Sequence, residues 1–237
     1  MQLFYGSVVS EGLAVLSESE TRHCLKVLRK GKGDEIRLTD GRGQLFRGRI
    51  LDGHKKGASV QILELIESKA TPETSVNLAF APTKNSSRFE WLLEKAVEVG
   101  VKRLLPFVGM HSERRKINSE RSAGIVLSAM KQSGRLWLPE WMPLQKLSDA
   151  IPRVAAEENS LKITAAQSGE IAVGDLDAGG RESWVFIGPE GDFSEQEYQL
   201  MHENGFIFVT LGDFRLRTET AGLVALTLLN SAIQNKK

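Results

Sequence analysis

The sequence predicts a small β-rich unit followed by an α/β sandwich with a mostly parallel sheet. Short strand-like segments separated by tight turns fill residues 34–66. From residue 76 onward, apolar strands alternate with helices, which is typical of α/β proteins. Residues 69–74 between them are polar, contain a proline and show no apolar period. We therefore expect a first domain at residues 1–68, a linker at 69–74 and a second domain at 75–237.

The first part is expected to form a small barrel. Its predicted strands are residues 34–39, 44–51 and 58–66. Asp-Gly pairs at 40–41 and 52–53 are tight-turn signals between these strands. The third strand alternates between two faces only up to Ile62. Before the strands, residues 20–28 predict a short helix, in which Cys24 is expected to be a buried thiol. Short strands with regular turns indicate a barrel.

The second part is expected to contain five strands and four helices. Two of the helices begin with a capping-box pattern, Ser87 with Glu90 and Ser194 with Glu197. The last helix is almost entirely apolar, so it has enough apolar surface for both a core and a subunit interface. The predicted strands are 76–81, 104–108, 161–165, 184–187 and 206–211, and the predicted helices are 87–100, 119–134, 194–205 and 218–233.

The charge distribution indicates a polyanionic partner for the first part. The net charge of the 237 residues is only +1. Residues 22–56 nevertheless contain eleven Lys or Arg against four Asp or Glu, whereas residues 155–205 contain two against eleven. A basic segment beside an acidic one favours nucleic acid as the partner, with an ordinary solvated surface as the alternative.

Composition also bears on which classes of protein this chain can belong to. Cys24 is the single cysteine, so a disulfide framework within the chain is excluded. The four histidines lack metal-ligand spacing, and we expect no metal. No apolar run has the length of a membrane span, and no signal-peptide pattern is present at the N-terminus. We therefore expect a cytoplasmic protein without a membrane partner.

The loop 187–194, Ile-Gly-Pro-Glu-Gly-Asp-Phe-Ser, follows a predicted buried strand and precedes a capped helix. Two glycines and a proline fix an unusual backbone path and permit close approach of a ligand. Loops at strand exits are where open α/β sheets bind ligands. A tight turn with no ligand is the alternative.

The loop 211–217, Leu-Gly-Asp-Phe-Arg-Leu-Arg, also connects a strand to a helix. Thr218 is a plausible N-cap and Glu219 suits a first helical turn. Neither role explains Arg215 and Arg217, because charges so near an apolar helix usually have partners or a function.

Together these two loops resemble the cofactor loops of the SPOUT methyltransferases. Ile-Gly-Pro-Glu-Gly at 187–191 and Leu-Arg-Thr-Glu-Thr-Ala at 216–221 are similar to the bacterial 16S rRNA uridine-N3 methyltransferase family. Further resemblance extends over nearly the whole chain, including a PUA-like pattern in the first part. The chain departs from the family pattern at Asp192, at Phe214-Arg215 and at Lys131.

The resemblance implies a SPOUT fold with a deep trefoil knot, a homodimer and bound S-adenosyl-L-methionine. It implies a partner, 16S rRNA, within the small ribosomal subunit. The residues expected to hold the cofactor are Ile187, Gly188, Pro189, Glu190, Gly191, Leu211, Gly212, Leu216, Arg217 and Thr218. The residues expected to bind RNA are Arg22, Lys26, Arg29, Arg47 and Arg49 from the basic segment, with Lys84 and Arg135.

Methylation at uracil N3 sets clear chemical demands. N3 must lose a proton, and Glu219 and Glu190 are the candidate bases. A cation beside the uracil carbonyls would stabilise the developing anion, a role that suits Arg217. Two alternatives are a non-catalytic RNA-binding or ribosome-assembly factor, and a methyltransferase acting on another RNA atom such as a ribose 2′-oxygen.

Overall fold

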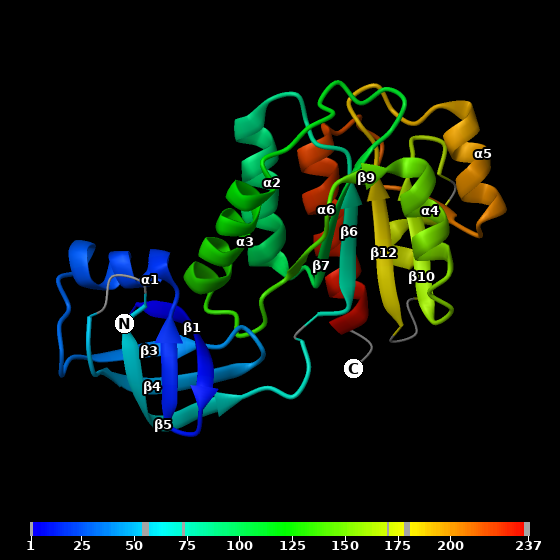
Figure 1. Ribbon diagram of the computed structural model, residues 1–237. Coiled ribbons are helices and arrows are strands. Elements are labelled where there is room, and N and C mark those ends of the chain that lie inside the picture. The colour runs from blue at the N-terminus through cyan, green and yellow to red at the C-terminus, as the bar shows by residue number, and fades with distance from the viewer. Residues whose placement is uncertain (1, 54–56, 73, 170, 178–180, 235–237) are drawn as a thin grey trace. The chain divides into compact units, whose positions relative to one another are not determined.

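The computed structural model describes residues 2–53, 57–72, 74–169, 171–177 and 181–234, in two compact units (Figure 1). One unit comprises Met1–Pro72 with Met130–Leu138, and the other comprises Glu73–Ala129 with Pro139–Lys237. The sequence places its linker at 69–74, near this division. It gives no indication that residues 130–138 return to the first unit, where the Oγ1 atom of Thr39 donates to the carbonyl of Leu136 (3.4 Å).

The first unit is a closed five-stranded barrel, which confirms the predicted barrel. The strands are β1 (Leu3–Ser10), β2 (Leu13–Leu16), β3 (Glu35–Thr39), β4 (Gln44–Ile50) and β5 (Ser59–Ser68), in the order β1-β2-β5-β4-β3. Its interior is apolar and includes Phe4, Leu38 and Phe46. Sequence analysis missed β1 and β2, because Val8 and Val9 are both exposed and leave β1 without a clear alternation.

Two local predictions in the barrel unit have clear outcomes. The alternation of β5 slips after Ile62 because Ile62 pairs with Gly48 while Glu64 pairs with Arg47, so that Leu63 is an extra, bulged residue. The expected helix is α1 (Glu18–Arg22), capped by Ser17, and continues as a π-helical turn, η1 (His23–Val27). Cys24 in this turn is buried, as predicted.

The second unit is an α/β domain with an entirely parallel eight-stranded sheet. Its strands are β6 (Val76–Phe80), β7 (Arg103–Val108), β8 (Glu140–Trp141), β9 (Gln145–Lys146), β10 (Ser160–Ala165), β11 (Ile171–Ala172), β12 (Glu182–Ile187) and β13 (Ile207–Thr210). The order is β11-β13-β10-β12-β6-β7-β8, and β9 pairs with β7. The predicted parallel sheet is therefore confirmed.

Helices cover the two faces of this sheet. The α6 helix (Thr218–Gln234) packs on one face, against β6 and β12, and the α2 helix (Ser86–Val99) packs beside α6, with Phe89 of α2 against Phe80 of β6. The α4 helix (Leu147–Ala155) and the α5 helix (Glu195–Glu203) pack on the other, around Phe107, Phe186 and Phe206. After β13 at the far side of β10, the chain returns so that α6 packs against β6 and β12. The trefoil knot that the resemblance implies would involve this return. The helix α3 spans Ser119–Ser133, and a 3-10 turn, η2, spans Val173–Asp175.

The two predicted capping boxes differ in outcome. The Ser194–Glu197 box is confirmed at the start of α5. The Ser87–Glu90 box is wrong, because Asn85 is the N-cap of α2 and its side-chain oxygen accepts from the backbone N–H groups of Ser87 and Arg88. The carboxylate of Glu90 instead pairs with Arg121, with the Nη2–Oε2 distance at 2.8 Å. The helix ends as predicted at Gly100, which adopts a left-handed conformation with φ of 99°.

Candidate functional site

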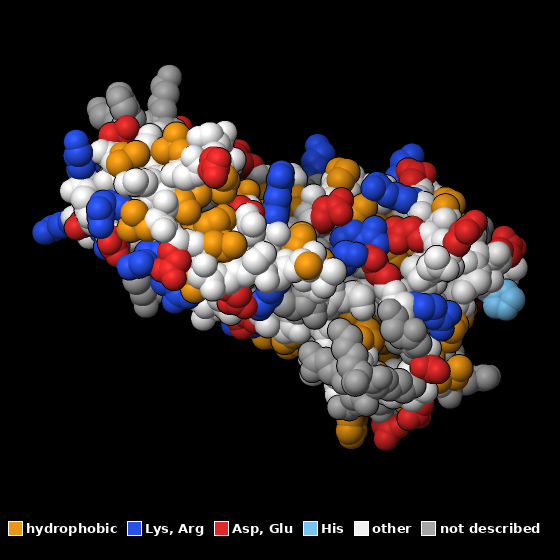
Figure 2. All heavy atoms as spheres, turned by 90° about the horizontal axis from the view of Figure 1, so that it is seen from below, with side chains coloured by type: hydrophobic (Ala, Val, Ile, Leu, Met, Phe, Trp, Pro, Cys, Tyr) orange, Lys and Arg blue, Asp and Glu red, His pale blue; other side chains and the backbone are white. Residues whose placement is uncertain are grey.

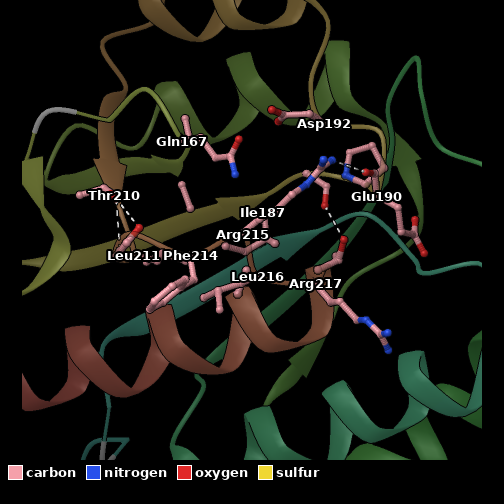
Figure 3. Close-up of a pocket in the computed structure, with 17 residues that line it drawn as sticks. Gln167, Ile187, Glu190, Asp192, Thr210, Leu211, Phe214, Arg215, Leu216 and Arg217 are labelled. Carbon is pink, nitrogen blue, oxygen red and sulfur yellow. Dashed lines mark hydrogen bonds between the residues drawn. The ribbon is translucent and has the colours of Figure 1, made fainter.

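A pocket of about 380 Å³ opens at the carboxyl ends of β10, β12 and β13 (Figure 3). These three strands are neighbours in the parallel sheet, so their exit loops meet at one edge. The lining comes from residues 165–167 after β10, residues 187–190 with Asp192 after β12, and residues 210–212 with 214–218 and Ala221 after β13. The structure thus brings together the two loops that the sequence singled out.

Every residue predicted to hold the cofactor lines this pocket, except Gly191. A Cβ atom at Gly191 would lie 3.0 Å from the Cβ atom of His111, in the loop after β7. The Nδ1 atom of His111 lies 3.1 Å from the carbonyl oxygen of Asp192. Gly191 therefore gives room to a neighbouring loop, while its chain neighbours Glu190 and Asp192 line the pocket, and its contact with a cofactor stays a prediction.

The departure at Asp192 has a structural explanation. Asp192 adopts a left-handed backbone conformation with φ of 64°, which usually favours glycine. Its Oδ1 atom accepts hydrogen bonds from the backbone N–H of Phe193 (2.8 Å) and from the hydroxyl of Tyr198 (2.7 Å). Burial and the hydrogen bond to this carboxylate raise the pKa of Tyr198, so its hydroxyl remains a donor. These bonds stabilise the unusual turn.

Direct hydrogen bonds join the two predicted loops. The Oγ1 atom of Thr218 donates to the carbonyl of Gly188 (3.1 Å), and the Nη2 atom of Arg215 donates to the carbonyl of Glu190 (3.4 Å). The predicted N-cap role of Thr218 is wrong, because Thr218 is already the first residue of α6. Its hydroxyl instead links the two loops. Gly212 has φ of 122°, a conformation that residues with a side chain rarely adopt.

The two arginines of the second loop differ in direction. The side chain of Arg215 extends toward Glu190 at the pocket, whereas the side chain of Arg217 extends away from the pocket (Figure 3). Arg217 is exposed and lines the pocket only near its backbone. Its guanidinium can therefore contact a group that lies outside the pocket.

The two candidate bases occupy different environments. Glu219 is buried, does not line the pocket, and has its Oε1 atom 3.6 Å from the Nε atom of Arg88. Glu190 is exposed and lines the pocket, and its Oε1 atom accepts from the backbone N–H of Lys84 (3.0 Å). Glu190 is thus nearer than Glu219 to any ligand in the pocket.

Sequence analysis missed a third lining loop, Ala165-Ala166-Gln167 after β10. The amide side chain of Gln167 extends into the pocket (Figure 3). The predicted strand 161–165 ended at this point, and the loop contains the glycine Gly169, but no resemblance drew attention to it. The structure shows that β10 lies between β12 and β13 in the sheet, which places the loop after β10 beside the other two loops. The sequence does not specify this strand order.

The predicted RNA-binding residues of the barrel unit are exposed but unequally neutralised. Arg47 and Arg49 both pair with Glu35, at 3.6 and 3.0 Å, and Arg47 also pairs with Glu64 at 2.9 Å. Arg22 pairs with Glu18 at 3.8 Å. Within the described part of the chain, Lys26 and Arg29 form no ion pair. Figure 2 shows basic, acidic and hydrophobic side chains interspersed on one face of this unit.

The other two predicted RNA-binding residues also differ. Arg135 is buried in the first unit, where a side chain is poorly placed for a phosphate. Lys84 is exposed at the pocket edge of the second unit, with its Nζ atom 2.7 Å from Glu113. The described residues contain no group of His, Cys, Asp and Glu suited to a metal, and no described helix is long and apolar enough to cross a membrane.

An α/β domain with a pocket at the carboxyl edge of its parallel sheet defines the class: a domain that binds a small molecule in its strand-exit loops. The chain belongs to the RNA methyltransferase family. Residues 70–230 match the model of the RNA methyltransferase domain, and residues 16–63 match the PUA domain of RNA methyltransferases. The family suggested by the two loops is thereby confirmed.

Relatives match the chain from end to end. The ribosomal RNA small subunit methyltransferase E of Aquifex aeolicus is 29% identical, over 97% of this chain and 99% of the relative. The crystal structure of a probable rRNA-methyltransferase from Porphyromonas gingivalis is 36% identical, with a TM-score of 0.84 over 100% of both chains. The ribosomal RNA small subunit methyltransferase E from Neisseria gonorrhoeae, bound to S-adenosyl methionine, is 29% identical, with a TM-score of 0.85 over 98% of this chain and 97% of that chain.

Proposed function

We propose that this chain transfers a methyl group from S-adenosyl-L-methionine to N3 of a specific uridine in 16S rRNA of the small ribosomal subunit. The pocket built by three strand-exit loops carries the proposal, in a chain that matches methyltransferases of this kind along its full length. The Neisseria gonorrhoeae relative binds S-adenosyl methionine, which supports the same cofactor here.

The pocket fits this cofactor. Its volume of about 380 Å³ lies within the range of about 300–1,000 Å³ usual for small-molecule sites. Apolar side chains such as Ile187, Leu211 and Leu216 provide contact area, and the main chain at Gly188 and Gly212 carries no side chain to block its polar groups. We propose that residues 187–190, 211–212 and 216–218 hold the cofactor mainly through backbone groups, with Gln167 as an added side-chain contact.

The reaction requires a proton to leave N3 before the N3–methyl bond forms and the sulfur–methyl bond breaks. Bound S-adenosylmethionine supplies the electrophilic methyl group. We propose Glu190 as the first candidate to accept the N3 proton, because it lines the pocket, and Glu219 as the second, since Arg88 already pairs with it. We propose that Arg217 donates to a uracil carbonyl oxygen as negative charge develops there.

The test of this function uses isotopically labelled S-adenosylmethionine with unmodified small ribosomal subunits. After digestion of the RNA, mass spectrometry identifies the labelled nucleoside. Label in N3-methyluridine at one site is expected. Label on a 2′-O-methyl ribose would contradict the target atom but keep the enzyme class. Cofactor binding without any labelled RNA would favour a non-catalytic RNA-binding or ribosome-assembly factor.

Replacing Gly191 with valine is expected to weaken S-adenosylmethionine binding indirectly. The new side chain would collide with His111, whose Cβ atom lies 3.0 Å from the position of a Cβ at residue 191. Overpacking of this kind costs the folded protein about 1–3 kcal/mol and shifts neighbouring backbone, here the loop that lines the pocket, so calorimetry should show weaker cofactor binding. The double variant Gly191→Val/His111→Ala should regain the affinity. Loss of affinity without that rescue would show that residue 191 meets the ligand directly.

We propose that the barrel unit binds RNA through the exposed Lys and Arg side chains of its basic segment. Lys26 and Arg29 are expected to contribute more than Arg47 and Arg49. Carboxylates already neutralise Arg47 and Arg49 in part. The double variant Lys26→Glu/Arg29→Glu should weaken RNA binding and flatten its dependence on salt. The double variant Arg47→Glu/Arg49→Glu should have the smaller effect. Equal salt slopes for both variants and the unmodified protein would identify the segment as a solvated surface only.

We propose that the protein is a cytoplasmic homodimer. The α6 helix is apolar over most of its middle part and packs against α2, β6 and β12, yet Leu228 remains 36% exposed on it, and Trp91 of α2 is 41% exposed. A second copy would cover such side chains. Light scattering at micromolar concentration should report the mass of a dimer. A fully active monomer under the same conditions would contradict the proposal.

A further inference from the structure

A second basic segment lies in the α/β unit, close to the pocket. Residues 110–116, Met-His-Ser-Glu-Arg-Arg-Lys, follow β7 and are named here the basic loop. Because β7 is parallel to the strands whose exit loops line the pocket, the basic loop emerges at the same edge of the sheet. In Figure 1 it belongs to the green connection between β7 and α3, at the ends of the strand arrows.

Contacts join the basic loop to the pocket. The Nδ1 atom of His111 lies 3.1 Å from the carbonyl oxygen of Asp192, which lines the pocket. Lys84 forms a second connection, since its backbone N–H donates to Glu190 (3.0 Å) and its Nζ atom lies 2.7 Å from Glu113 of the basic loop. A ligand reaching the pocket mouth therefore lies beside this loop.

The positive charge of the basic loop is not neutralised within the described structure. Glu113 is its single acidic residue and is paired with Lys84. Among the described residues, Arg114, Arg115 and Lys116 form no ion pair. By contrast, Lys95, Lys102, Arg103 and Arg121 of the same unit each pair with a glutamate.

Backbone carbonyl groups hold the two arginines of the loop in place. The Nε atom of Arg114 donates to the carbonyl of Lys116 (3.2 Å), and the Nη2 atom of Arg115 donates to the carbonyl of Met110 (3.0 Å). The guanidinium of Arg114 lies 4.8 Å from the ring centre of Phe89, and its Nη1 atom is buried without a hydrogen-bond partner. Carbonyl bonds orient a guanidinium without cancelling its charge, and each arginine keeps further N–H donors.

We propose that the basic loop binds RNA phosphates next to the target nucleotide, with Arg115 and Lys116 as the principal contacts. This proposal rests on the proposed function, because it takes the target base to react at the adjacent pocket. Arg115 and Lys116 are exposed, adjacent in the chain and without an ion pair among the described residues, which suits the successive phosphates of a polyanion. Arg114, by contrast, is partly buried against Phe89. The cofactor has a single carboxylate, which the loop's charge exceeds. The acidic composition of residues 155–205 makes a basic surface on this unit distinctive.

The test compares charge reversals within one unit. Arg115→Glu/Lys116→Glu removes two contacts, and Arg153→Glu on α4 is the control, because Arg153 is also exposed but lies on a helix that does not line the pocket. The measurements are the affinity for in-vitro transcribed, unmodified 16S rRNA over a series of salt concentrations, and the affinity for S-adenosylmethionine by calorimetry.

The double variant should bind the RNA about tenfold more weakly, and its log–log salt slope should fall by about 1.4, since each phosphate contact contributes about 0.7 for single strands. Its cofactor affinity and thermal unfolding should match those of the Arg153→Glu control. An unchanged RNA affinity and slope would overturn the proposal, as would a loss confined to cofactor affinity. These readouts do not require methyl transfer, so failure of the proposed reaction would be seen separately in the labelling experiment.

Discussion

Replacing Arg217 with alanine is expected to lower turnover by about a hundredfold at saturating cofactor, while cofactor affinity changes little. The guanidinium extends away from the pocket and is exposed, so we expect cofactor affinity not to depend on it (Figure 3). Its proposed role is to stabilise negative charge on a uracil carbonyl oxygen, and loss of one such donor typically costs a factor of about 10²–10³ in rate. Steady-state kinetics of methyl transfer, with calorimetry of cofactor binding, measure the two effects.

Arg215 provides the matched control for this experiment. It lies in the same loop, two residues away, but its side chain extends to the pocket and donates to the carbonyl of Glu190. Arg215→Ala should weaken cofactor binding more than it lowers turnover at saturating cofactor. Arg217→Lys should restore little activity if the contact with uracil is bidentate. Equal losses in cofactor affinity for Arg215→Ala and Arg217→Ala would contradict the division of roles between the two arginines.

Replacing Arg103 with leucine is expected to destabilise the α/β unit by about 3 kcal/mol. The side chain of Arg103 is only 18% exposed and forms two hydrogen bonds with Glu157, at 2.8 and 2.7 Å. It also contacts Glu182, donates to Asn77 and lies over the ring of Trp184. Removing this cation leaves the partly buried carboxylate of Glu157 without a cationic partner, whereas Glu182 keeps its ion pair with Lys102. Breaking a buried pair in this way typically costs about 3–5 kcal/mol. Urea denaturation measures the change, and Arg153→Leu on an exposed helix face should have little effect.

The same cluster predicts a dependence on pH. Burial alone would raise the pKa of Glu157, but hydrogen bonds from Arg103 and Trp184 outweigh it and lower that pKa. The pKa of Glu182 is lowered in the same way, because hydrogen bonds from Lys102 and Asn77 outweigh the effect of burial. Because both folded-state pKa values lie below the usual value, this stabilisation is present above about pH 4.3 and is lost as the pH falls through them.

The leucine variant isolates this contribution. Without Arg103, Glu157 loses the main group that lowers its pKa and Glu182 loses one of several, so less stabilisation remains to be lost in acid. The difference in unfolding free energy between the natural protein and Arg103→Leu should therefore shrink as the pH is lowered from 6 toward 3. A difference that stays constant over this range would show that the network does not set these pKa values.

The sequence by itself determined the architecture and the two principal loops of the site. Alternating apolar strands and helices follow from local periodicity, and a glycine- or proline-containing loop after a buried strand is visible without a fold. The string from Leu216 to Ala221, together with residues 187–191, was specific enough to indicate the family that the comparisons confirm. Local signals of this kind depend on neighbours in the chain, which the sequence contains.

Only the tertiary structure decided which groups meet. The order of the parallel strands brings Gln167 into the pocket, which the sequence of its own loop did not indicate. The packing of the loop after β7 gives Gly191 its function, because the atom that a side chain there would meet belongs to His111, eighty positions earlier. Side-chain direction likewise separates Arg215, which extends to the pocket, from Arg217, which extends away from it, and the sequence did not indicate these directions. Contacts between residues distant in the chain are set by strand order and loop packing, which a single sequence does not specify.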